Sequence, residues 1–250
     1  AVCGAIFLVP FFLCAYALSL VPAPGPDDVA QRTERAPMDA AARRGFTRRY
    51  WPGLLALVIT YLFLTAYRDF RDNFQADIWR ETGQAGAAVF TATQVPIALG
   101  VMAVLSLIYL LKNNRVALIA TYGVMIGRSA MVGASTLLYD IGWLAPKSWM
   151  MLVGLGLFLA YVPYGCILFD RTVATLGTVA TAVFLIYVSD AVAYGGSVGV
   201  VLYKMLGQPD LPYLSFFRIF SYAMSLASAA LFGYSLVYFL RQPRASSEVG

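Results

Sequence analysis

The sequence predicts an all-α protein, a polytopic bundle of about seven transmembrane helices. Of its 250 residues 60% are hydrophobic and 12% are charged, and the mean hydropathy is +0.71, well above the usual soluble range. Apolar runs of about 20 residues or more recur along the chain, and each could cross the hydrocarbon core as a helix. Because the alternating pattern of a membrane barrel is missing, helices are the spanning structure that we expect.

The apolar runs give seven spans, at about residues 1–20, 52–76, 87–111, 115–138, 148–169, 172–203 and 214–240. Residues 1–20 begin AVCGAIFLVPFFLC, with no basic segment ahead of the apolar run, which argues against a signal peptide. We interpret the chain as a fragment that starts inside or just before a membrane helix. Residues 51–241 hold six further spans, followed by a tail at 242–250.

Residues 21–50 form a polar segment that begins VPAPGPDD and ends AARRGFTRRY. Its proline-rich start predicts a stiff linker, and Asp39 is the expected N-cap of a short basic amphipathic helix. If this segment is cytoplasmic, the cytoplasmic side holds Arg32, Arg35, Arg43, Arg44, Arg48, Arg49, Lys112, Arg115, Arg171, Arg241 and Arg244, against Arg80, Lys147 and Lys204 outside. This bias predicts an orientation in which the linker and the C-terminus are cytoplasmic.

Composition also argues against several functions. The net charge of +5 is divided among membrane loops, so we expect no nucleic-acid partner. The chain has no histidine, which removes Ser-His and Cys-His catalysis and histidine metal sites. Cys3, Cys14 and Cys166 lack metal-ligand spacing, and we interpret them as small core residues. We therefore expect no enzyme, no cofactor and no metal site.

The second span contains an unusual charged stretch, ITYLFLTAYRDFRDNFQADIW, from Ile59 to Trp79. Trp51 and Trp79 would lie about 42 Å apart in one helix, close to the full membrane thickness, with an aromatic residue at each interface. Arg68, Asp69, Arg71 and Asp72 would then lie within the outer leaflet. The alternative is that the helix ends near Tyr67 and the charges form a solvated cap.

Helical periodicity divides this stretch into two faces. Tyr61, Thr65, Arg68, Asp72, Gln75 and Trp79 share one stripe, whereas Ile59, Phe63, Ala66, Phe70 and Phe74 gather on the opposite face, which we expect to contact lipid. A charge at the bilayer centre costs about 2.5 to 3.5 kcal/mol, so the charged residues need partners on the same helix, a neighbouring helix or water in a cavity. Arg68 and Asp72 are spaced to pair along the helix.

A second polar stripe lies in the span at 172–203, where Tyr187, Asp190, Tyr194 and Ser197 share one face. Measured from Thr172, Asp190 lies about 27 Å along the helix, close to the expected depth of Arg68. We therefore predict that Asp190 pairs with Arg68, directly or through one water, with Arg71 as the alternate partner.

Weaker polar signals occur in other spans. Gln94 is close to Pro96, Tyr164 follows Pro163, and Arg128 lies between glycines. Kinks or close helix packing are the structural alternatives to a role in binding for these residues.

Three segments, LTAYRDFRDNFQADIW, VPYGCILFDRTVA and YVSDAVAYGGSVGVVLYK, resemble an uncharacterised bacterial membrane-protein family of unknown function. The order of one span, a long basic loop and six further spans resembles the last helix of an N-terminal half followed by the complete C-terminal half of the major facilitator superfamily. It implies that residues 1–20 are the last helix of a preceding N-terminal half, that residues 51–241 are a six-helix C-terminal bundle, and that the protein lies in a bacterial inner membrane. That resemblance implies that the spans beginning at 52, 87, 148 and 172 line a central cavity, while those beginning at 115 and 214 are peripheral. Residues 111–118, LKNNRVAL, depart from the Gly-x-x-x-Asp-Arg type gating motif of many members, which leaves room for a protein that no longer transports.

From these features we expect a transporter-like protein that moves an unknown small solute by alternating access. Arg68 or Arg71 would bind an anionic group or balance Asp190, and Asp190 or Asp72 would carry a coupling proton. The substrate or coupling-ion candidates are Arg68, Arg71, Asp72, Asp190, Tyr61, Gln94, Tyr164, Tyr187 and Tyr194. The expected partners are the lipid bilayer, the N-terminal half of the same protein and a small-molecule substrate. The alternative function is a non-transporting membrane sensor or assembly factor that contacts partners or anionic lipid through its basic loop.

The topology can be tested by labelling single cysteines placed at Ala36 and Ser247, in a background without the native cysteines. Both positions are expected to react only after the cells are opened, because six spans separate two segments on the same side. Labelling of either position from outside intact cells would overturn this orientation.

Overall fold

A computed structural model describes residues 5, 8–23, 25, 38–84, 86–177 and 181–243, and all the regular structure in them is helical. The chain divides into two compact units, Ala1–Glu34 and Arg35–Gly250. In the first unit, α2 (Leu8–Ser19) is apolar and exposed along its whole length. Its 12 residues are fewer than a span needs, and part of the span expected at 1–20 lies outside the described residues.

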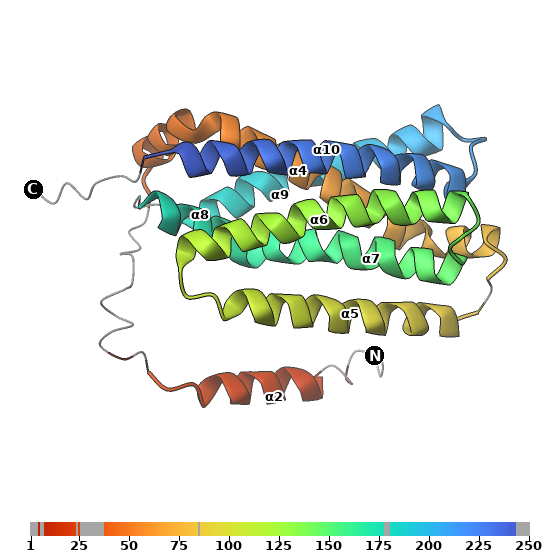
Figure 1. Ribbon diagram of the computed structural model, residues 1–250, viewed down its shortest axis with the longest axis horizontal. Helices are drawn as coiled ribbons and strands as arrows, with labels where there is room; N and C mark the ends of the chain where they lie inside the picture. The colour runs from red at the N-terminus through yellow and green to blue at the C-terminus, as the bar shows by residue number, and fades with distance from the viewer. Residues whose placement is uncertain are drawn as a thin grey trace, which may run out of the picture. The chain divides into compact units, whose positions relative to one another are not determined.

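The second unit is a bundle of long helices (Figure 1). Its elements are α4 (Ala40–Glu81), α5 (Ala88–Tyr109), α6 (Asn114–Asp140), α7 (Pro146–Pro163), the π-helix η1 (Tyr164–Leu168), α8 (Phe169–Leu176), α9 (Ala182–Leu202), the π-helix η2 (Tyr203–Gly207) and α10 (Tyr213–Arg241). Because α7, η1 and α8 are continuous, as are α9 and η2, the described part of the chain has six helical segments long and apolar enough to cross a membrane. This confirms an all-α, multi-pass membrane architecture.

The helix α4 is continuous over 42 residues. Asp39 caps it, as predicted, because its Oδ1 accepts a hydrogen bond of 2.7 Å from the backbone N–H of Ala42. The basic segment is therefore the first part of the spanning helix rather than a separate one. The alternative in which the helix ends near Tyr67 is wrong, and the charged residues lie inside the helix.

The helices α4, α6, α7 and α10 make up the centre of the bundle. α10 packs against both α4 and α6, α7 packs against α6 and touches α4, and the two remaining helices flank this group, α9 against α4 and α5 against α7 (Figure 1). The helices α4 and α7 therefore lie between α9 and α5. The helices α6 and α10, which the superfamily resemblance made peripheral, instead belong to the central group of this bundle.

The central position of α4 overturns one expectation about its faces. Ala66 and Phe70 were expected to contact lipid, but both are fully buried. Phe70 packs against Phe216 of α10, with ring centroids 4.7 Å apart, and Tyr67 stacks on Phe217 at 4.9 Å. The apolar face of α4 is covered by a neighbouring helix, and periodicity alone does not distinguish a helix from lipid as the apolar partner.

The boundary expected at Thr172 is also wrong. The helix that begins at Pro146 continues to Leu176 and ends at Gly177, whose φ of 65° is the left-handed conformation that glycine adopts readily. The next helix begins at Ala182. Asp190 therefore lies about 12 Å from the start of its helix rather than 27 Å.

Hydroxyl side chains join α10 to its neighbours. Ser225 donates a 2.6 Å hydrogen bond to the carbonyl oxygen of Ser129, and the hydroxyls of Tyr122 and Ser235 lie 2.8 Å apart. A Cβ atom at Gly133 would lie 2.5 Å from the Ser225 Oγ, so a glycine at this position of α6 makes room for the side chain of Ser225 on α10. Small residues at a close helix contact are typical of membrane bundles.

The cysteines differ from expectation. Cys14 and Cys166 are exposed free thiols and therefore not core residues, while Cys3 lies outside the described residues. Helix positions that face outward in a membrane bundle are apolar too, so composition around these cysteines did not reveal their exposure.

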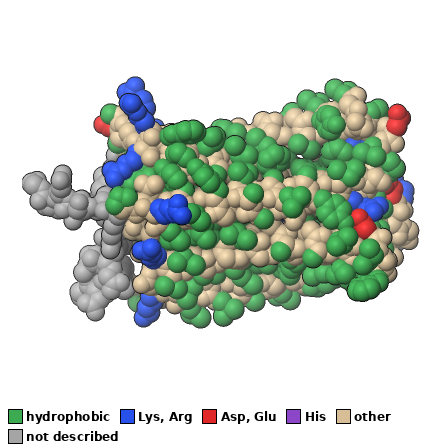
Figure 2. All heavy atoms as spheres, turned by 45° about the horizontal axis from the view of Figure 1, so that its top comes forward, with side chains coloured by type: hydrophobic (Ala, Val, Ile, Leu, Met, Phe, Trp, Pro, Cys, Tyr) green, Lys and Arg blue, Asp and Glu red, His purple; other side chains and the backbone are tan. Residues whose placement is uncertain are grey.

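Basic side chains gather at the end of the bundle where α4 begins and α10 ends (Figure 2). The helices and loops at this end carry Arg43, Arg44, Arg48, Arg49, Lys112, Arg115, Arg171 and Arg241. Arg32, Arg35, Ala36, Arg244 and Ser247 lie outside the described residues. In the second unit, the loops that were assigned to the cytoplasm do meet at one end.

Glu81 at the end of α4 caps the start of α10, because its two carboxylate oxygens accept hydrogen bonds from the N–H groups of Tyr213 (3.0 Å) and Leu214 (2.8 Å). Replacing Glu81 by Ala is expected to lower the free energy of unfolding by about 1 kcal/mol, as for other helix N-caps. Unfolding in detergent titrated with dodecyl sulfate measures the change. Asp77→Ala is the matched control on the same turn of α4, because it removes only an ion pair to the exposed Arg80, worth about 0 to 1 kcal/mol. Equal effects of the two substitutions would contradict the capping role.

Candidate functional site

The charged stretch of α4 connects three helices through one ion pair. Arg68 and Asp69 are adjacent in the sequence, and the Nη2 atom of Arg68 lies 2.6 Å from the Oδ1 atom of Asp69. Arg68 also donates a hydrogen bond to the hydroxyl of Tyr161 on α7, with its guanidinium 4.4 Å from the centroid of that ring. The other oxygen of Asp69 accepts a hydrogen bond from Ser197 on α9. The pair thus joins α4 to both α7 and α9.

Three tyrosines lie next to this pair. The ring of Tyr61 stacks against Tyr164, with centroids 4.2 Å apart, and against Tyr161 at 5.6 Å. The side chain of Tyr61 lies near Asp190, and the Tyr164 hydroxyl lies 3.1 Å from the hydroxyl of Ser189. Tyr61, Tyr164 and Asp190, which the sequence indicated separately, therefore belong to one cluster on α4, α7 and α9.

The local backbone of α7 positions these rings. Tyr161 and Tyr164 are three residues apart, so they project from the same side of the helix. The π-helix η1 begins at Tyr164, directly after Pro163. Single turns of π-helix occur frequently at functional sites.

A second polar group surrounds Arg71. Its side chain is fully buried and lies 3.2 Å from Asp72, which is about half exposed. With its amide oxygen turned toward Arg71, Gln94 of α5 accepts hydrogen bonds from the two terminal nitrogens of the guanidinium at 3.2 and 3.1 Å and from Gln75 at 3.2 Å. A Cβ atom at Gly154 would lie 2.8 Å from an Arg71 terminal nitrogen, so this glycine of α7 makes room for the guanidinium.

The predicted direct ion pair between Arg68 and Asp190 is not formed in the described residues, and neither is the pair between Arg68 and Asp72. Each arginine pairs with the aspartate that follows it. The helices α4 and α9 run parallel, and contacts place Asp190 level with Tyr61 but Ser197 level with Asp69. Asp190 therefore lies about 10 Å along the bundle from Arg68, because seven residues separate Tyr61 from Arg68.

The polar stripe of α9 is partly open. Tyr187 and Tyr194 are 70% and 54% exposed, and Asp190 between them is half-buried. Ser197 at the end of the stripe is buried against Asp69. The described residues thus bring Asp190 to the Tyr61 cluster, while Tyr187 and Tyr194 keep most of their surface exposed and Tyr194 lies within electrostatic range of Arg68.

Sequence reasoning missed four residues of the site. Asp69, Tyr161, Ser189 and Ser197 take part in its contacts and were not chosen as candidates. The spacing of Tyr161 and Tyr164 was a usable signal, because residues three apart share a helix face. The pairing of Arg68 with Asp69, its neighbour in the sequence, depends on the side-chain conformations. Helical spacing predicts contacts between residues three or four apart and therefore did not indicate this pair.

Arg128 is another buried cation of the bundle. Its Nε donates to the carbonyl oxygen of Met125 at 3.3 Å, and its guanidinium lies 5.8 Å from the ring of Phe232. Both terminal nitrogens lack a hydrogen-bond partner among the described residues. It lies between α6 and α10, within electrostatic range of Tyr67 on the face of α4 that packs against α10.

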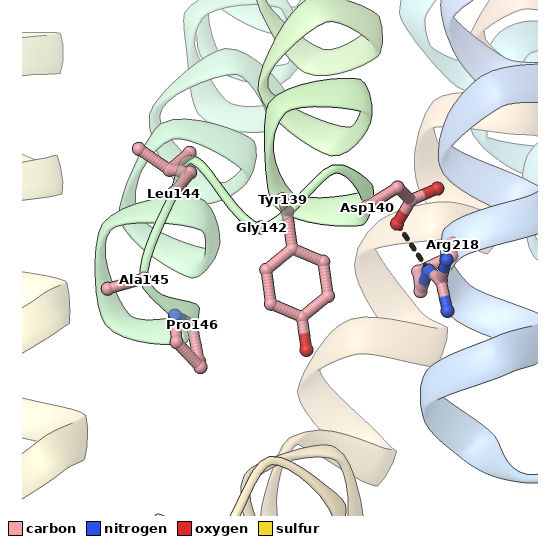
Figure 3. A pocket seen from close by; sticks show the side chains of 7 residues that line it. All are labelled: Tyr139, Asp140, Gly142, Leu144, Ala145, Pro146 and Arg218. Carbon is pink, nitrogen blue, oxygen red and sulfur yellow. Dashed lines mark hydrogen bonds and ion pairs between the residues drawn. The ribbon is translucent and has the colours of Figure 1, made fainter.

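A cleft of about 550 Å³ lies at the end of the bundle opposite the basic end (Figure 3). It is lined by Tyr139, Asp140, Gly142, Leu144, Ala145, Pro146 and Arg218, and none of the predicted site residues belongs to it. Arg218 pairs with Asp140 at 2.6 Å, and Tyr222 donates a hydrogen bond of 2.8 Å to the same carboxylate. This pair joins the start of α10 to the end of α6. In the described part of the chain, no group of three or more His, Cys, Asp or Glu residues is arranged to hold a metal ion.

The profile of a family of unknown function (DUF5690) matches residues 1–242. No curated protein and no solved structure matches the chain.

The ion pair between Arg68 and Asp69 can be tested by a double-mutant cycle. Asp69→Asn is expected to lower the free energy of unfolding by about 1.5 to 3 kcal/mol, because it removes a charged hydrogen-bond acceptor from a half-buried arginine. Adding Arg68→Gln is expected to restore much of this loss. Unfolding in detergent titrated with dodecyl sulfate provides the free energies.

The control is the same cycle between Arg68 and Asp190, which is expected to give a smaller coupling energy because no ion pair joins these residues. A larger coupling between Arg68 and Asp190 than between Arg68 and Asp69 would refute the assigned pairing.

Proposed function

Since the chain belongs to a family of unknown function (DUF5690), we propose its function from its own residues: it is a membrane transporter that moves a small solute by alternating access. The observation that carries the proposal is the cluster of partly exposed charges and tyrosines on α4, α7 and α9, inside helices long enough to span a membrane. The proposal includes no catalytic residue and no cofactor.

The energetics of charges in a membrane support this proposal. A charge at the bilayer centre costs about 2.5 to 3.5 kcal/mol, so charged residues in spanning helices normally face water, a partner or a solute. Arg68, Asp69 and Asp72 all keep part of their side-chain surface exposed. A purely structural contact would be served as well by buried apolar residues. Partly exposed charges in the middle of the bundle favour a path for a polar solute.

The helix arrangement supports the same function. By resemblance to the major facilitator superfamily, the spans that become α4, α5, α7 and α9 line the cavity, and α4 and α7 do lie between α9 and α5. The other two long helices, α6 and α10, pack against each other on the remaining side of α4 and α7. In this proposal a second half of the same protein covers the exposed stripe of α9. The proposed orientation, in a bacterial inner membrane, places the basic end in the cytoplasm.

The contacts also narrow the roles of the candidate residues. Arg68 and Arg71 each pair with an adjacent aspartate, so we assign them to positioning and charge balance. Asp190 has no ion-pair partner among the described residues. We therefore assign the transported charge, on a coupling proton or on the solute, to Asp190 rather than to Asp72.

The second candidate is a sensor or assembly factor that contacts partners or anionic lipid. The observation in its favour is the first part of α4, where Arg43, Arg44, Arg48 and Arg49 belong to the same helix as Arg68 and the site. A lipid or protein bound there would act on the site through one continuous helix.

A transport screen with the full-length protein in proteoliposomes, with and without a proton gradient, tests the proposal. Wild-type protein is expected to accumulate at least one solute, and Asp190→Asn is expected to abolish gradient-driven uptake while leaving the unfolding transition unchanged. Asp77→Asn is the matched control, because this carboxylate pairs with Arg80 at the end of α4 and is expected to leave uptake intact. Uptake by Asp190→Asn at the wild-type rate would remove Asp190 from the mechanism. Absence of uptake for all solutes would favour the sensor.

A further inference from the structure

The arginines of α4 leave little charge for an anionic solute. Arg68 lies 2.6 Å from Asp69, and Arg71 lies 3.2 Å from Asp72. The charge of each guanidinium is thus balanced by the carboxylate of the next residue. Arg71 is moreover fully buried, and its terminal nitrogens donate hydrogen bonds to the amide oxygen of Gln94, so no solute reaches it without displacing these neighbours. The two pairs are close to electrically neutral units.

Asp190 differs from the other carboxylates of the site. It is half-buried, and none of the ion pairs formed by the described residues includes it. Its polar neighbour is the hydroxyl of Tyr61, which carries no charge. The uncompensated charge of this cluster is therefore negative.

Two exposed aromatic rings flank this carboxylate. Tyr187 precedes Asp190 by three residues and Tyr194 follows it by four, so all three project from one face of α9. The two tyrosines are 70% and 54% exposed. Aromatic faces attract cations within about 6 Å, and tyrosine rings already do so elsewhere in this bundle, for example where Arg68 lies over Tyr161 and Lys204 over Tyr213.

On these grounds, and resting on the transport function proposed above, we propose that the solute is an organic ammonium ion, bound by the Asp190 carboxylate between the rings of Tyr187 and Tyr194. The carboxylate supplies the opposite charge, and the rings supply a surface for the carbon atoms around the nitrogen. A divalent metal ion fits less well, because it needs about six oxygen ligands and the described residues gather no such set.

Arg128, whose terminal nitrogens also lack partners, does not alter this charge balance. Only 2% of its surface is exposed, and it packs against Phe232 between α6 and α10. A solute at the exposed face of α9 does not reach it.

Equilibrium binding to the full-length protein in nanodiscs tests the proposal without requiring transport. The probes are choline and benzyltrimethylammonium, compared by isothermal titration with 3,3-dimethylbutan-1-ol, the neutral carbon analogue of choline, and with acetate. We expect both ammonium probes to bind at least about tenfold more tightly than the neutral analogue and acetate, because only they carry the complementary charge.

Substitutions then locate the site. Asp190→Asn is expected to weaken binding of the ammonium probes by about tenfold or more, and Tyr187→Leu or Tyr194→Leu by about two- to tenfold, whereas the Phe variants keep the ring and most of the affinity. Asp77→Asn and Tyr203→Leu are matched controls that remove an ion-paired carboxylate and an exposed tyrosine elsewhere, and they are expected to leave binding unchanged. An unchanged unfolding transition shows that each variant is folded.

The outcomes separate this inference from the transport function. Equal affinity for choline and its neutral analogue, preference for acetate, no binding of either ammonium probe, or full affinity in Asp190→Asn would overturn it. Uptake of an unrelated solute without ammonium binding would overturn it and leave transport standing. Ammonium binding that depends on Asp190, without uptake, would support the site and refute the transport function.

Discussion

The contact between Arg68 and Asp69 is the interaction on which the polar centre of this bundle depends. Adjacent residues of a helix project about 100° apart, so an arginine and an aspartate in sequence point toward two different neighbours. Arg68 accordingly reaches Tyr161 on α7, and Asp69 accepts from Ser197 on α9, while the two charges remain 2.6 Å apart. One neutral pair thereby attaches two helices to α4 without leaving either charge unpaired in the membrane.

The contacts that α4 makes with its neighbours also require these helices to pack closely against it. Arg71 occupies space that a side chain at Gly154 of α7 would fill, and a Cβ atom at Gly196 of α9 would overlap Leu62. Glycines on both neighbouring helices thus lie where α4 presents large side chains. Gly195, Gly196 and Gly199 lie close together on α9. A Cβ atom at Gly195 or Gly199 would have no neighbouring atom within 4 Å, so packing in the described structure requires glycine only at Gly196.

The sequence predicted the helical membrane class, the Asp39 cap and the polar stripe of α4, because these depend on local periodicity and capping. It did not predict which residues are level with one another on different helices. The run at 172–203 is apolar across Gly177, so the helix boundary was placed ten residues early and the depth of Asp190 was wrong by about 15 Å. The burial of Phe70 also depends on which helix covers it, and no local pattern contains that information.

The difference between paired and unpaired charges explains why the proposed site lies at Asp190. A carboxylate held by an arginine gains little from a second cation, whereas one whose polar neighbour is a tyrosine hydroxyl has an opposite charge to gain. Asp190 also follows Ser189, whose hydroxyl contacts Tyr164 at the first residue of the π-helix η1. A shift of this turn toward regular α-helical geometry would move Tyr164 relative to both Tyr61 and α9. In the proposed cycle, η1 is therefore the part of the continuous segment Pro146–Leu176 best placed to couple helix movement to the surroundings of Asp190.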